Sequence, residues 1–393
     1  MDFSFKFDPE VIIGADTLSL AGTACSRHGE RVMIAADHDL DTQVVNRLKD
    51  ILEDSGVKAI VFDGVHEDSS ADMADNIVEL GRAAHCNAVI GIGGGKALLI
   101  ARMAAIMAPS RITSFELLDG RKITEKFLPF IAVPTAGLDP FAFTEFFIAA
   151  DPRDRIVKSV YSPHGLNAAV VIDSALFKFP SVSSVAMEIF NGFMAAIEAY
   201  CSSKANFLSD ALLERALNFY AKLIKGGANG LNAVISADPN SGASTANNLL
   251  DTYAQACFLT SLGSAASSPG IGAALSYAIT ARFHDVKQQC AAALLPFITE
   301  RLAAARPEKM SRVASFLGNT KAASVAEAAN SASASILRSM EAFGIKPSLK
   351  EFNLPLDKLT AAADAARKLE FVSNSPWTVS EDDIFEILKK ITA

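Results

Sequence analysis

The stretch NAVIGIGGGKALLIAR, residues 87–102, combines a short apolar run, three consecutive glycines, a lysine and an amphipathic tail. It predicts a strand that runs directly into a tight turn and then into a helix. In that turn Gly93, Gly94 and Gly95 let the backbone approach a pyrophosphate closely, and the helix N-terminus offers free N–H groups. Lys96 adds a positive charge. The stretch therefore predicts a dinucleotide-binding turn, although a strand–helix turn without a ligand has the same pattern.

The residues on both sides of this turn alternate between two patterns. Short β-branched runs occupy residues 11–13, 31–35, 58–62 and 87–92. Amphipathic stretches of helical length occupy residues 19–28, 42–55, 70–85 and 96–108. Four more strand-like runs, which we expect to extend or flank the sheet, follow at residues 130–134, 143–149, 156–161 and 169–172. This alternation predicts a parallel sheet covered by helices on both faces.

From about Ser181 onward the sequence is rich in alanine and helical in period, with no convincing strand run. The change falls near Phe179-Pro180. We therefore expect an α/β dinucleotide-binding domain over residues 1–180 and an all-α domain over residues 181–393. Within the helical half, the Asn-, Gly- and Ser-rich segment 226–246 is typical of a loop.

Asp37 ends the second β-branched run, RVMIAAD. A carboxylate at that place can accept hydrogen bonds from a ribose diol and repel a 2′-phosphate, which favours NAD and leaves NADP as the alternative cofactor. An Asp that caps the next helix would show the same pattern.

Composition narrows the choice of partners. The chain has 393 residues, is 50% hydrophobic and carries a net charge of −8 with both signs interspersed, which argues against a nucleic-acid or anionic-membrane partner. Its five cysteines are odd in number and form no C-x-x-C pair, so buried thiols in a reducing cytosol are expected. No signal peptide or membrane span is evident, because prolines and acids interrupt the most apolar stretch. We expect a cytoplasmic protein with a small-molecule substrate.

Several further segments match the motifs of one known family in order. They are VIIGADTL at 11–18, GIGGGKALLIAR at 91–102, AVPTAG at 132–137, KSVYSPHGLNAAVVIDSALFKFP at 158–180 and AAIEAYCSSKANFLSDALLERAL at 195–217. Together they resemble the iron-containing alcohol dehydrogenase family, whose relatives include glycerol dehydrogenase and dehydroquinate synthase. The resemblance covers nearly the whole chain. It implies the family's two-domain fold with an active site between the domains, cofactor contacts at Thr135 and Lys158, and a homodimer.

The sequence departs from the family pattern at its metal ligands. Metal-dependent members hold iron or zinc with one Asp and three His, and the ungapped match places Asn191 and Ala195 at the Asp and at the first His. Of the six histidines in the chain, only His284 follows residue 180. We therefore expect no tightly bound metal. The family's Gly-Thr-Gly-Ser segment is also replaced, by LDPFAF at 138–143.

A positive side chain could replace the metal as the group that polarises a carbonyl oxygen. Lys287 stands near one ligand position of the family, and Tyr277 stands near another. Our hypothesis is that Lys287 polarises the carbonyl and Tyr277 relays the proton. The alternatives are a lysine that extends to solvent at the rim of the cleft and a tyrosine bonded to backbone.

These features lead to two main hypotheses. The first is an NAD(P)-linked oxidoreductase that acts on a small alcohol or carbonyl compound without the family's catalytic metal. The second is a non-catalytic homologue that binds a dinucleotide or metabolite. A lyase reaction like that of dehydroquinate synthase also relies on zinc, so the missing ligands count against it. A working reductase needs a proton donor and an oxyanion stabiliser at the nicotinamide, which distinguishes the first hypothesis from the second.

Overall fold

The computed structural model describes residues 5–66, 68–161, 167–235 and 244–393. The chain divides into two compact units. The N-terminal unit comprises Met1–Asp154 and Lys158–Lys178, and the C-terminal unit comprises Arg155–Val157 and Phe179–Ala393. All five cysteines are free thiols, as the sequence indicated.

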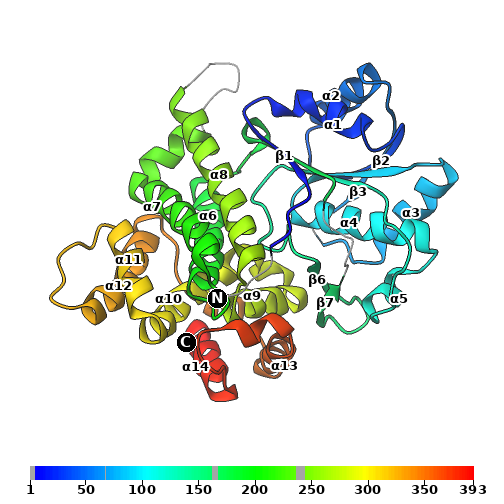
Figure 1. Cartoon of the computed structure of the whole chain (residues 1–393). Coiled ribbons are helices and arrows are strands. Elements are labelled where there is room, and N and C mark those ends of the chain that lie inside the picture. The colour runs from blue at the N-terminus through cyan, green and yellow to red at the C-terminus, as the bar shows by residue number, and fades with distance from the viewer. Residues whose placement is uncertain (1–4, 67, 162–166, 236–243) are drawn as a thin grey trace. The chain divides into compact units, whose positions relative to one another are not determined.

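A six-stranded sheet forms the centre of the N-terminal unit, with strand order β1-β8-β5-β4-β2-β3 (Figure 1). All its paired strands are parallel, which confirms the α/β prediction. The strands are β1 (Glu10–Gly14), β2 (Arg31–Asp37), β3 (Lys58–Val65), β4 (Ala88–Gly93), β5 (Phe130–Pro134) and β8 (Ala169–Asp173). Because every strand points the same way, their carboxyl ends meet at one edge, where α/β sheets commonly bind ligands.

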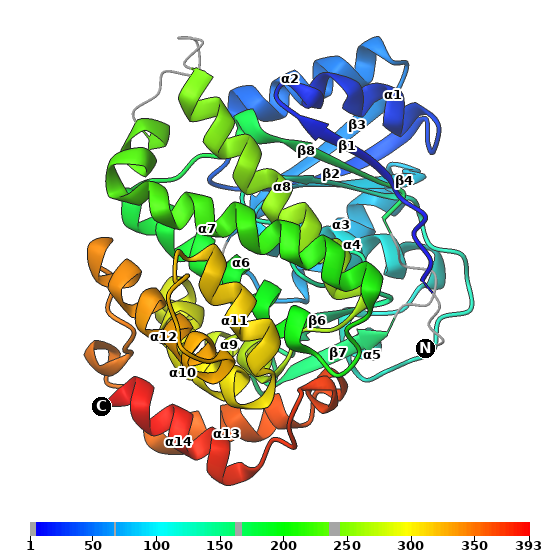
Figure 2. The same cartoon turned by 60° about the vertical axis from the view of Figure 1, so that its left-hand side comes forward.

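Helices cover both faces of this sheet because apolar side chains alternate along its strands. On β2, Val32, Ile34 and Ala36 join one buried cluster with residues of α1 (Ala21–Ser26) and α2 (Thr42–Asp54). Met33 on the same strand faces the other side and packs near Gly81 of α3. Helices α3 (Met73–Ala83) and α4 (Gly95–Ser110) cover that second face (Figure 2). A short helix, α5 (Ser114–Leu118), follows α4.

Two of the four later strand-like runs do not join the main sheet. β6 (Phe146–Ala150) and β7 (Val157–Tyr161) pair with each other as a separate two-stranded sheet. The strand expected over residues 143–149 begins three residues later, at Phe146. The reason is that residues 141–144 form a turn.

The described residues of the C-terminal unit are almost entirely helical, as the sequence predicted. Its nine described helices are α6 (Val182–Cys201), α7 (Phe207–Ile235), α8 (Ser244–Ala266), α9 (Ile271–Arg282), α10 (Lys287–Ala305), α11 (Pro307–Phe316), α12 (Val325–Ala342), α13 (Leu356–Arg367) and α14 (Glu381–Thr392). Helix α6 packs against α7, α8, α9 and α10, so most of its side chains are buried. None of the described helices has the length and hydropathy needed to cross a bilayer.

The prediction of a loop over residues 226–246 was wrong in part. Helix α7 continues to Ile235 after a break at Gly227, whose φ of 66° lies in the left-handed region. Glycine adopts that conformation at little cost, so the chain can change direction there and resume a helix. Helix α8 begins at Ser244, and residues 236–243 lie outside the described part of the chain.

Candidate functional site

The glycine turn lies where β4 becomes α4, at the carboxyl edge of the sheet. Gly93 has a φ of 142°, and a Cβ added there would lie 2.5 Å from the Cβ of Asp37, so only glycine fits this position. Gly94 is the N-cap residue of α4, and no side chain caps this helix. A Cβ at Gly95 would meet nothing within 4 Å. The helix therefore presents its first N–H groups in open space, which is the arrangement that binds phosphate.

Lys96 supplies a cation at the same turn. Burial lowers the pKa of its ammonium group, while the more distant charge of Asp68 opposes this effect. Among the residues that the structure describes, no carboxylate forms a salt bridge with Lys96. A partly buried ammonium group loses hydration, and a phosphate group would compensate that loss.

Asp37 braces this turn instead of capping the next helix. Its Oδ2 accepts a hydrogen bond from the Gly94 N–H at 3.3 Å, and its Oδ1 accepts one from the Asp39 N–H at 3.2 Å. The N-cap of α2 is Asp41, whose side chain accepts from the Gln43 N–H at 3.0 Å. The capping alternative for Asp37 is thereby removed, and its contact with a ribose stays a prediction.

Thr135 lies beside the same turn, because its N–H donates to the Gly93 carbonyl at 3.0 Å. It directly follows β5, the neighbour of β4 on the side away from β2. The structure thus brings Asp37, Thr135 and the Gly93–Lys96 turn together at the ends of three adjacent strands. These are the residues that the sequence assigned to the cofactor, with one exception.

The exception is Lys158, which lies on β7 in the separate two-stranded sheet. Its Nζ lies 2.7 Å from Oδ2 of the buried Asp151 and 3.4 Å from Oδ1 of Asp119. The hydrogen bond with Asp151 is the main reason that the pKa of Lys158 is raised. The ammonium group thus has carboxylate partners within the fold, and its cofactor contact stays a prediction.

The LDPFAF segment, for which the sequence offered no role, is held by Arg102 of α4. The Arg102 side chain is buried, and its Nη1 and Nη2 donate to the carbonyls of Phe141 at 3.2 Å and Thr144 at 2.7 Å. Asp139 Oδ1 accepts from the Phe141 N–H at 2.7 Å and shapes the turn. Desolvation lowers the pKa of Arg102 to about 10. The segment is therefore a fixed turn clamped to the helix that starts at the glycine turn.

In the C-terminal unit, α6 carries both positions at which the resemblance places metal ligands. Asn191 offers one amide oxygen, which is buried and has no hydrogen-bond partner, and Ala195 offers only a methyl group. Throughout the described residues, no three His, Cys, Asp or Glu side chains gather as a metal site. This donor set does not fit a four-coordinate iron or zinc ion, so we derive no chemical step through a metal.

The closest match to the family motif, AAIEAYCSSKANFLSD, has a structural explanation. Glu198 is 3% exposed and accepts hydrogen bonds from the N–H groups of Gly272 at 2.6 Å and Ala273 at 2.9 Å, in the first turn of α9. Burial raises its pKa to about 7. Lys309 of α11 donates to the Tyr200 carbonyl at 2.7 Å and to Asp210 at 2.6 Å. The motif therefore ties α6 to α7, α9 and α11, and Glu198 has a structural role in it.

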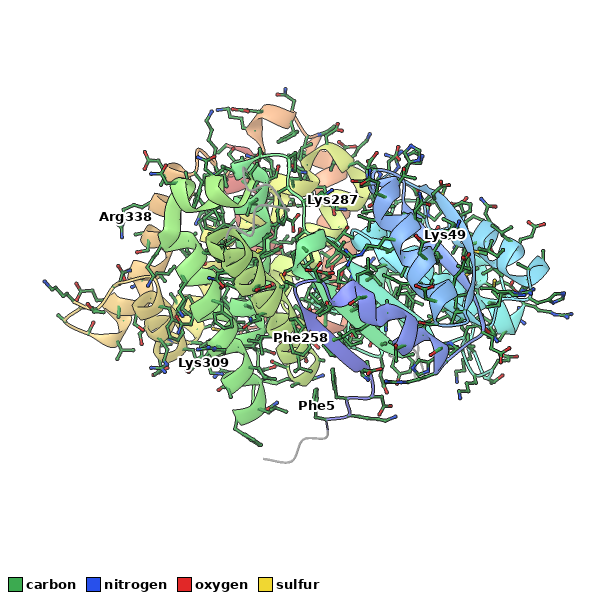
Figure 3. All side chains as sticks on the ribbon, turned by 90° about the horizontal axis from the view of Figure 1, so that it is seen from above. Phe5, Lys49, Phe258, Lys287, Lys309 and Arg338 are labelled. Atoms are coloured by element: carbon green, nitrogen blue, oxygen red, sulfur yellow. The ribbon has the colours of Figure 1, made fainter. Side chains whose placement is uncertain are left out.

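The two residues assigned to polarisation and proton relay lie on neighbouring helices. Tyr277 is half-buried on α9. Lys287 is exposed at the first position of α10, and Figure 3 marks it there and Lys309 on α11. A cation at a helix N-terminus faces the positive end of the helix dipole, which disfavours it and favours an anion beside it. The roles of Lys287 and Tyr277 stay predictions.

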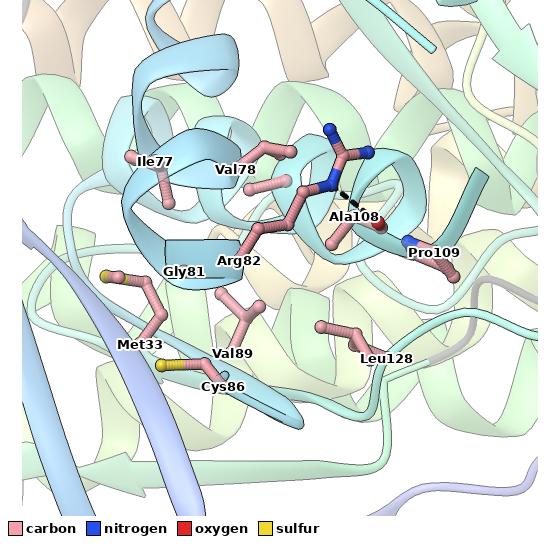
Figure 4. A pocket seen from close by; sticks show the side chains of 11 residues that line it. Met33, Ile77, Val78, Gly81, Arg82, Cys86, Val89, Ala108, Pro109 and Leu128 are labelled. Carbon is pink, nitrogen blue, oxygen red and sulfur yellow. Dashed lines mark hydrogen bonds between the residues drawn. The ribbon is translucent and has the colours of Figure 1, made fainter. Parts of the chain in front are cut away.

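A small apolar cavity in the N-terminal unit lies away from the glycine turn (Figure 4). It has a volume of about 90 Å³ and lies between α3, α4 and the first residues of β2 and β4. At its edge Arg82 donates to the carbonyls of Ala108 and Met107, both at 3.0 Å. Because Met33 and Val89 belong to the amino ends of their strands, this cavity is remote from the candidate cofactor site.

A parallel sheet with an uncapped glycine turn at its carboxyl edge, followed in the chain by an all-helical unit, defines a class of dinucleotide-binding proteins. The chain belongs to the iron-containing alcohol dehydrogenase family. The model of that family, "Iron-containing alcohol dehydrogenase", matches residues 8–174, and the model of the family's C-terminal part matches residues 185–392. The chain is therefore a member of a family of oxidoreductases.

Individual relatives are distant but span almost the whole chain. The 1,3-propanediol dehydrogenase of Citrobacter freundii is 22% identical over 382 residues, which cover 96% of this chain and 95% of the relative. The sulfoacetaldehyde reductase of Bilophila wadsworthia is 24% identical and covers 92% and 91%. A crystal structure of 1,3-propanediol oxidoreductase, 20% identical, covers 100% of both chains with a TM-score of 0.88. That of a Bifidobacterium kashiwanohense sulfoacetaldehyde reductase with NAD+, 17% identical, covers 100% and 99% with a TM-score of 0.80.

Proposed function

We propose that this protein is an NAD(P)-linked oxidoreductase for a small alcohol or carbonyl compound and works without the family's catalytic metal. The observation that carries the proposal is the Gly93–Lys96 turn, where an uncapped helix N-terminus meets a lysine for which the described residues provide no salt bridge. The named substrates of the relatives, propanediol and sulfoacetaldehyde, support a small substrate. When bound, the nicotinamide supplies or accepts a hydride. The chain must bind the cofactor and stabilise the charge that develops on the substrate oxygen.

Asn191 and Ala195 support the metal-independent part of the proposal. An uncharged amide and a methyl group provide neither the charge nor the donor number that holds iron or zinc. Metal analysis of the purified protein tests this part directly. We expect far less than one iron or zinc per chain, and a stoichiometric metal that resists chelators would contradict it.

On this proposal Lys287 polarises the carbonyl oxygen and Tyr277 relays the proton. Asp37 makes NAD the expected cofactor, with NADP as the alternative. The Lys287→Met protein should lose most of its turnover, because charge on the substrate oxygen would no longer be offset. Full turnover by that variant would end the role of Lys287 while leaving the cofactor site untouched.

The alternative is a homologue that binds a dinucleotide without catalysis, and one experiment separates the two. Thermal shift is measured with NADH, with NADPH and without nucleotide, and turnover is measured on a panel of short aldehydes and alcohols. We expect a larger shift with NADH and turnover on at least one substrate. A nucleotide shift without turnover would favour the binding protein. A homodimer and a cytoplasmic location belong to the same proposal, and size-exclusion chromatography and cell fractionation test them.

A further inference from the structure

Helix α6 carries two carboxyl groups whose pKa is raised by burial, Glu188 and Glu198. For Glu198 the fold gives a reason, since its oxygens accept two N–H groups of α9. Glu188 is different. Among the described residues no donor forms a hydrogen bond or salt bridge with its carboxyl group, and desolvation alone raises its pKa. Glu188 is half-buried, and a desolvated acid without a partner is less stable when ionised.

A second unsatisfied polar group lies one helical turn away. Asn191 lies three residues after Glu188, and Ala195 lies seven residues after Glu188, so the three share one face of α6. The Oδ1 of Asn191 is buried without a hydrogen-bond partner, and buried amide oxygens are rarely left so. Ala195 adds only a methyl group to this face. A protonated Glu188 is a donor and the Asn191 oxygen is an acceptor, so together they match a ligand that carries both functions.

The surroundings of Glu188 favour its neutral form. Burial is the main reason that the pKa values of Tyr220 on α7 and Tyr253 on α8 are raised, and the charge of Glu188 adds to both, so its carboxyl group lies near both phenols. Cys257 of α8 is the third titratable group there, with its Sγ 3.6 Å from the Tyr220 hydroxyl. No Lys, Arg or His in the described part of the chain is close enough to shift the pKa of Glu188. Burial, with no positive partner among the described residues, favours the neutral acid, which can donate a proton.

We propose that Glu188 protonates the substrate oxygen during carbonyl reduction and that the Asn191 oxygen accepts the hydroxyl group of the alcohol product. The inference rests on the proposed oxidoreductase function and makes Glu188 the group that donates the proton to the substrate oxygen. The carbonyl carbon takes up a hydride from the reduced nicotinamide, and the carbonyl oxygen takes up the carboxyl proton. The products are the alcohol, the oxidised nicotinamide and the Glu188 carboxylate, which regains a proton from water. The substrate class is a short aldehyde or ketone.

The first test compares Glu188→Gln with Glu198→Gln. Glutamine resembles a carboxyl group that is already neutral, so Glu188→Gln should melt no lower than the wild type. Its kcat for aldehyde reduction should fall about 100-fold with little change in KM, as expected for loss of a general acid. Activity of the wild type should fall as pH rises through the raised pKa of Glu188, and the variant should lack that limb. Glu198→Gln should instead melt at a lower temperature than the wild type, and its activity should still fall as pH rises.

The second test needs no turnover. A short carboxamide imitates the aldehyde, since its carbonyl can accept from Glu188 and its NH2 can donate to Asn191. Calorimetry with the NADH complex should show about tenfold weaker carboxamide binding in Glu188→Met, which removes the donor, or about 1.4 kcal/mol; Glu188→Gln, whose amide N–H can still donate, should bind nearly as the wild type does. Unchanged kcat and pH profile in Glu188→Gln, or a wild type that binds no carboxamide, would overturn the inference. A wild type that binds NADH and carboxamide but reduces no aldehyde would overturn the oxidoreductase proposal and keep Glu188 in the ligand site.

Discussion

Two regions of the molecule retain the family pattern to very different degrees. One is the Gly93–Lys96 turn, and the other is the face of α6 that carries Glu188, Asn191 and Ala195. In the turn, the groups proposed to bind the cofactor are backbone N–H groups, which are present whatever the side chains are, provided that glycine allows the backbone conformation. On α6 the chemistry depends on side chains, and an amide and a methyl group stand at the ligand positions. A cofactor site built from backbone can therefore persist while the reacting site beside the substrate changes its chemistry.

The largest expected effect is on stability and NADH binding, and it tests whether the turn needs glycine at position 93. In Gly93→Ala the new Cβ would meet the Cβ of Asp37 at 2.5 Å, at a φ of 142°. We expect a loss of about 4 kcal/mol in unfolding free energy, together with loss of NADH binding. Denaturant titration measures the first and nucleotide thermal shift the second.

Gly95→Ala is the matched control, because it lies in the same turn with open space around its Cβ. It should be as stable as the wild type or slightly more stable, since alanine favours a helix. If Gly93→Ala were as stable as Gly95→Ala, the turn would not need the backbone conformation that glycine allows at position 93.

The second prediction concerns the buried acids of α6 and the pH dependence of stability. The pKa of Glu198 rises from 4.5 to about 7 on folding, so the folded state binds its proton more tightly than the unfolded chain. The stabilising contribution of the neutral form is complete below pH 4.5 and is lost as pH rises to about 7. The shift corresponds to on the order of 3 kcal/mol.

Urea titrations from pH 4 to pH 8 measure this slope. Glu188 acts in the same direction, because its pKa is also raised. Each of Glu188→Gln and Glu198→Gln should therefore flatten part of the slope, and the double variant should flatten it further. A slope that neither variant changes would mean that both groups ionise as freely in the folded protein as in the unfolded chain.

The same difference separates the features that the sequence could predict from those that it could not. The alternating pattern and the glycine turn are local, so the sheet, its covering helices and the place of the glycine turn could be predicted from the residues themselves. The clamp of Arg102 on the LDPFAF segment did not, because its carbonyl partners lie 39 and 42 residues further along the chain. The break at Gly227 also escaped prediction, since a glycine-rich composition favours a loop unless packing restores the helix.

Glu188 was missed although a signal was present in the sequence. In VAMEIF it is a single acid among apolar residues, three before Asn191, and that spacing alone puts both on one helix face. What the sequence could not show is that Glu198, on the same helix, finds two N–H partners at the start of α9 while Glu188 finds none among the described residues. Only tertiary packing separates the structural acid from the candidate donor.

The smallest expected effect concerns Lys96 in the glycine turn and its contribution to NADH affinity. Lys96 is the counterpart of Glu188, since each is a partly buried ionisable group for which the described residues provide no ion pair. Lys96→Met should weaken NADH binding about tenfold, roughly 1.4 kcal/mol, because one cation–phosphate contact is lost. The same variant should melt no lower than the wild type, since methionine avoids the desolvation of an ammonium group.

Lys122→Met, on an exposed stretch of the same unit, is the control for the loss of charge and should change neither property. Raising the salt concentration should weaken NADH binding to the wild type more than to Lys96→Met, because salt screens the lost contact. If Lys96→Met instead lowers stability and leaves NADH affinity unchanged, the lysine supports the fold, and the turn would hold its ligand with backbone groups alone. In that case a ligand would account for Glu188, for which the described residues provide no partner, but not for Lys96.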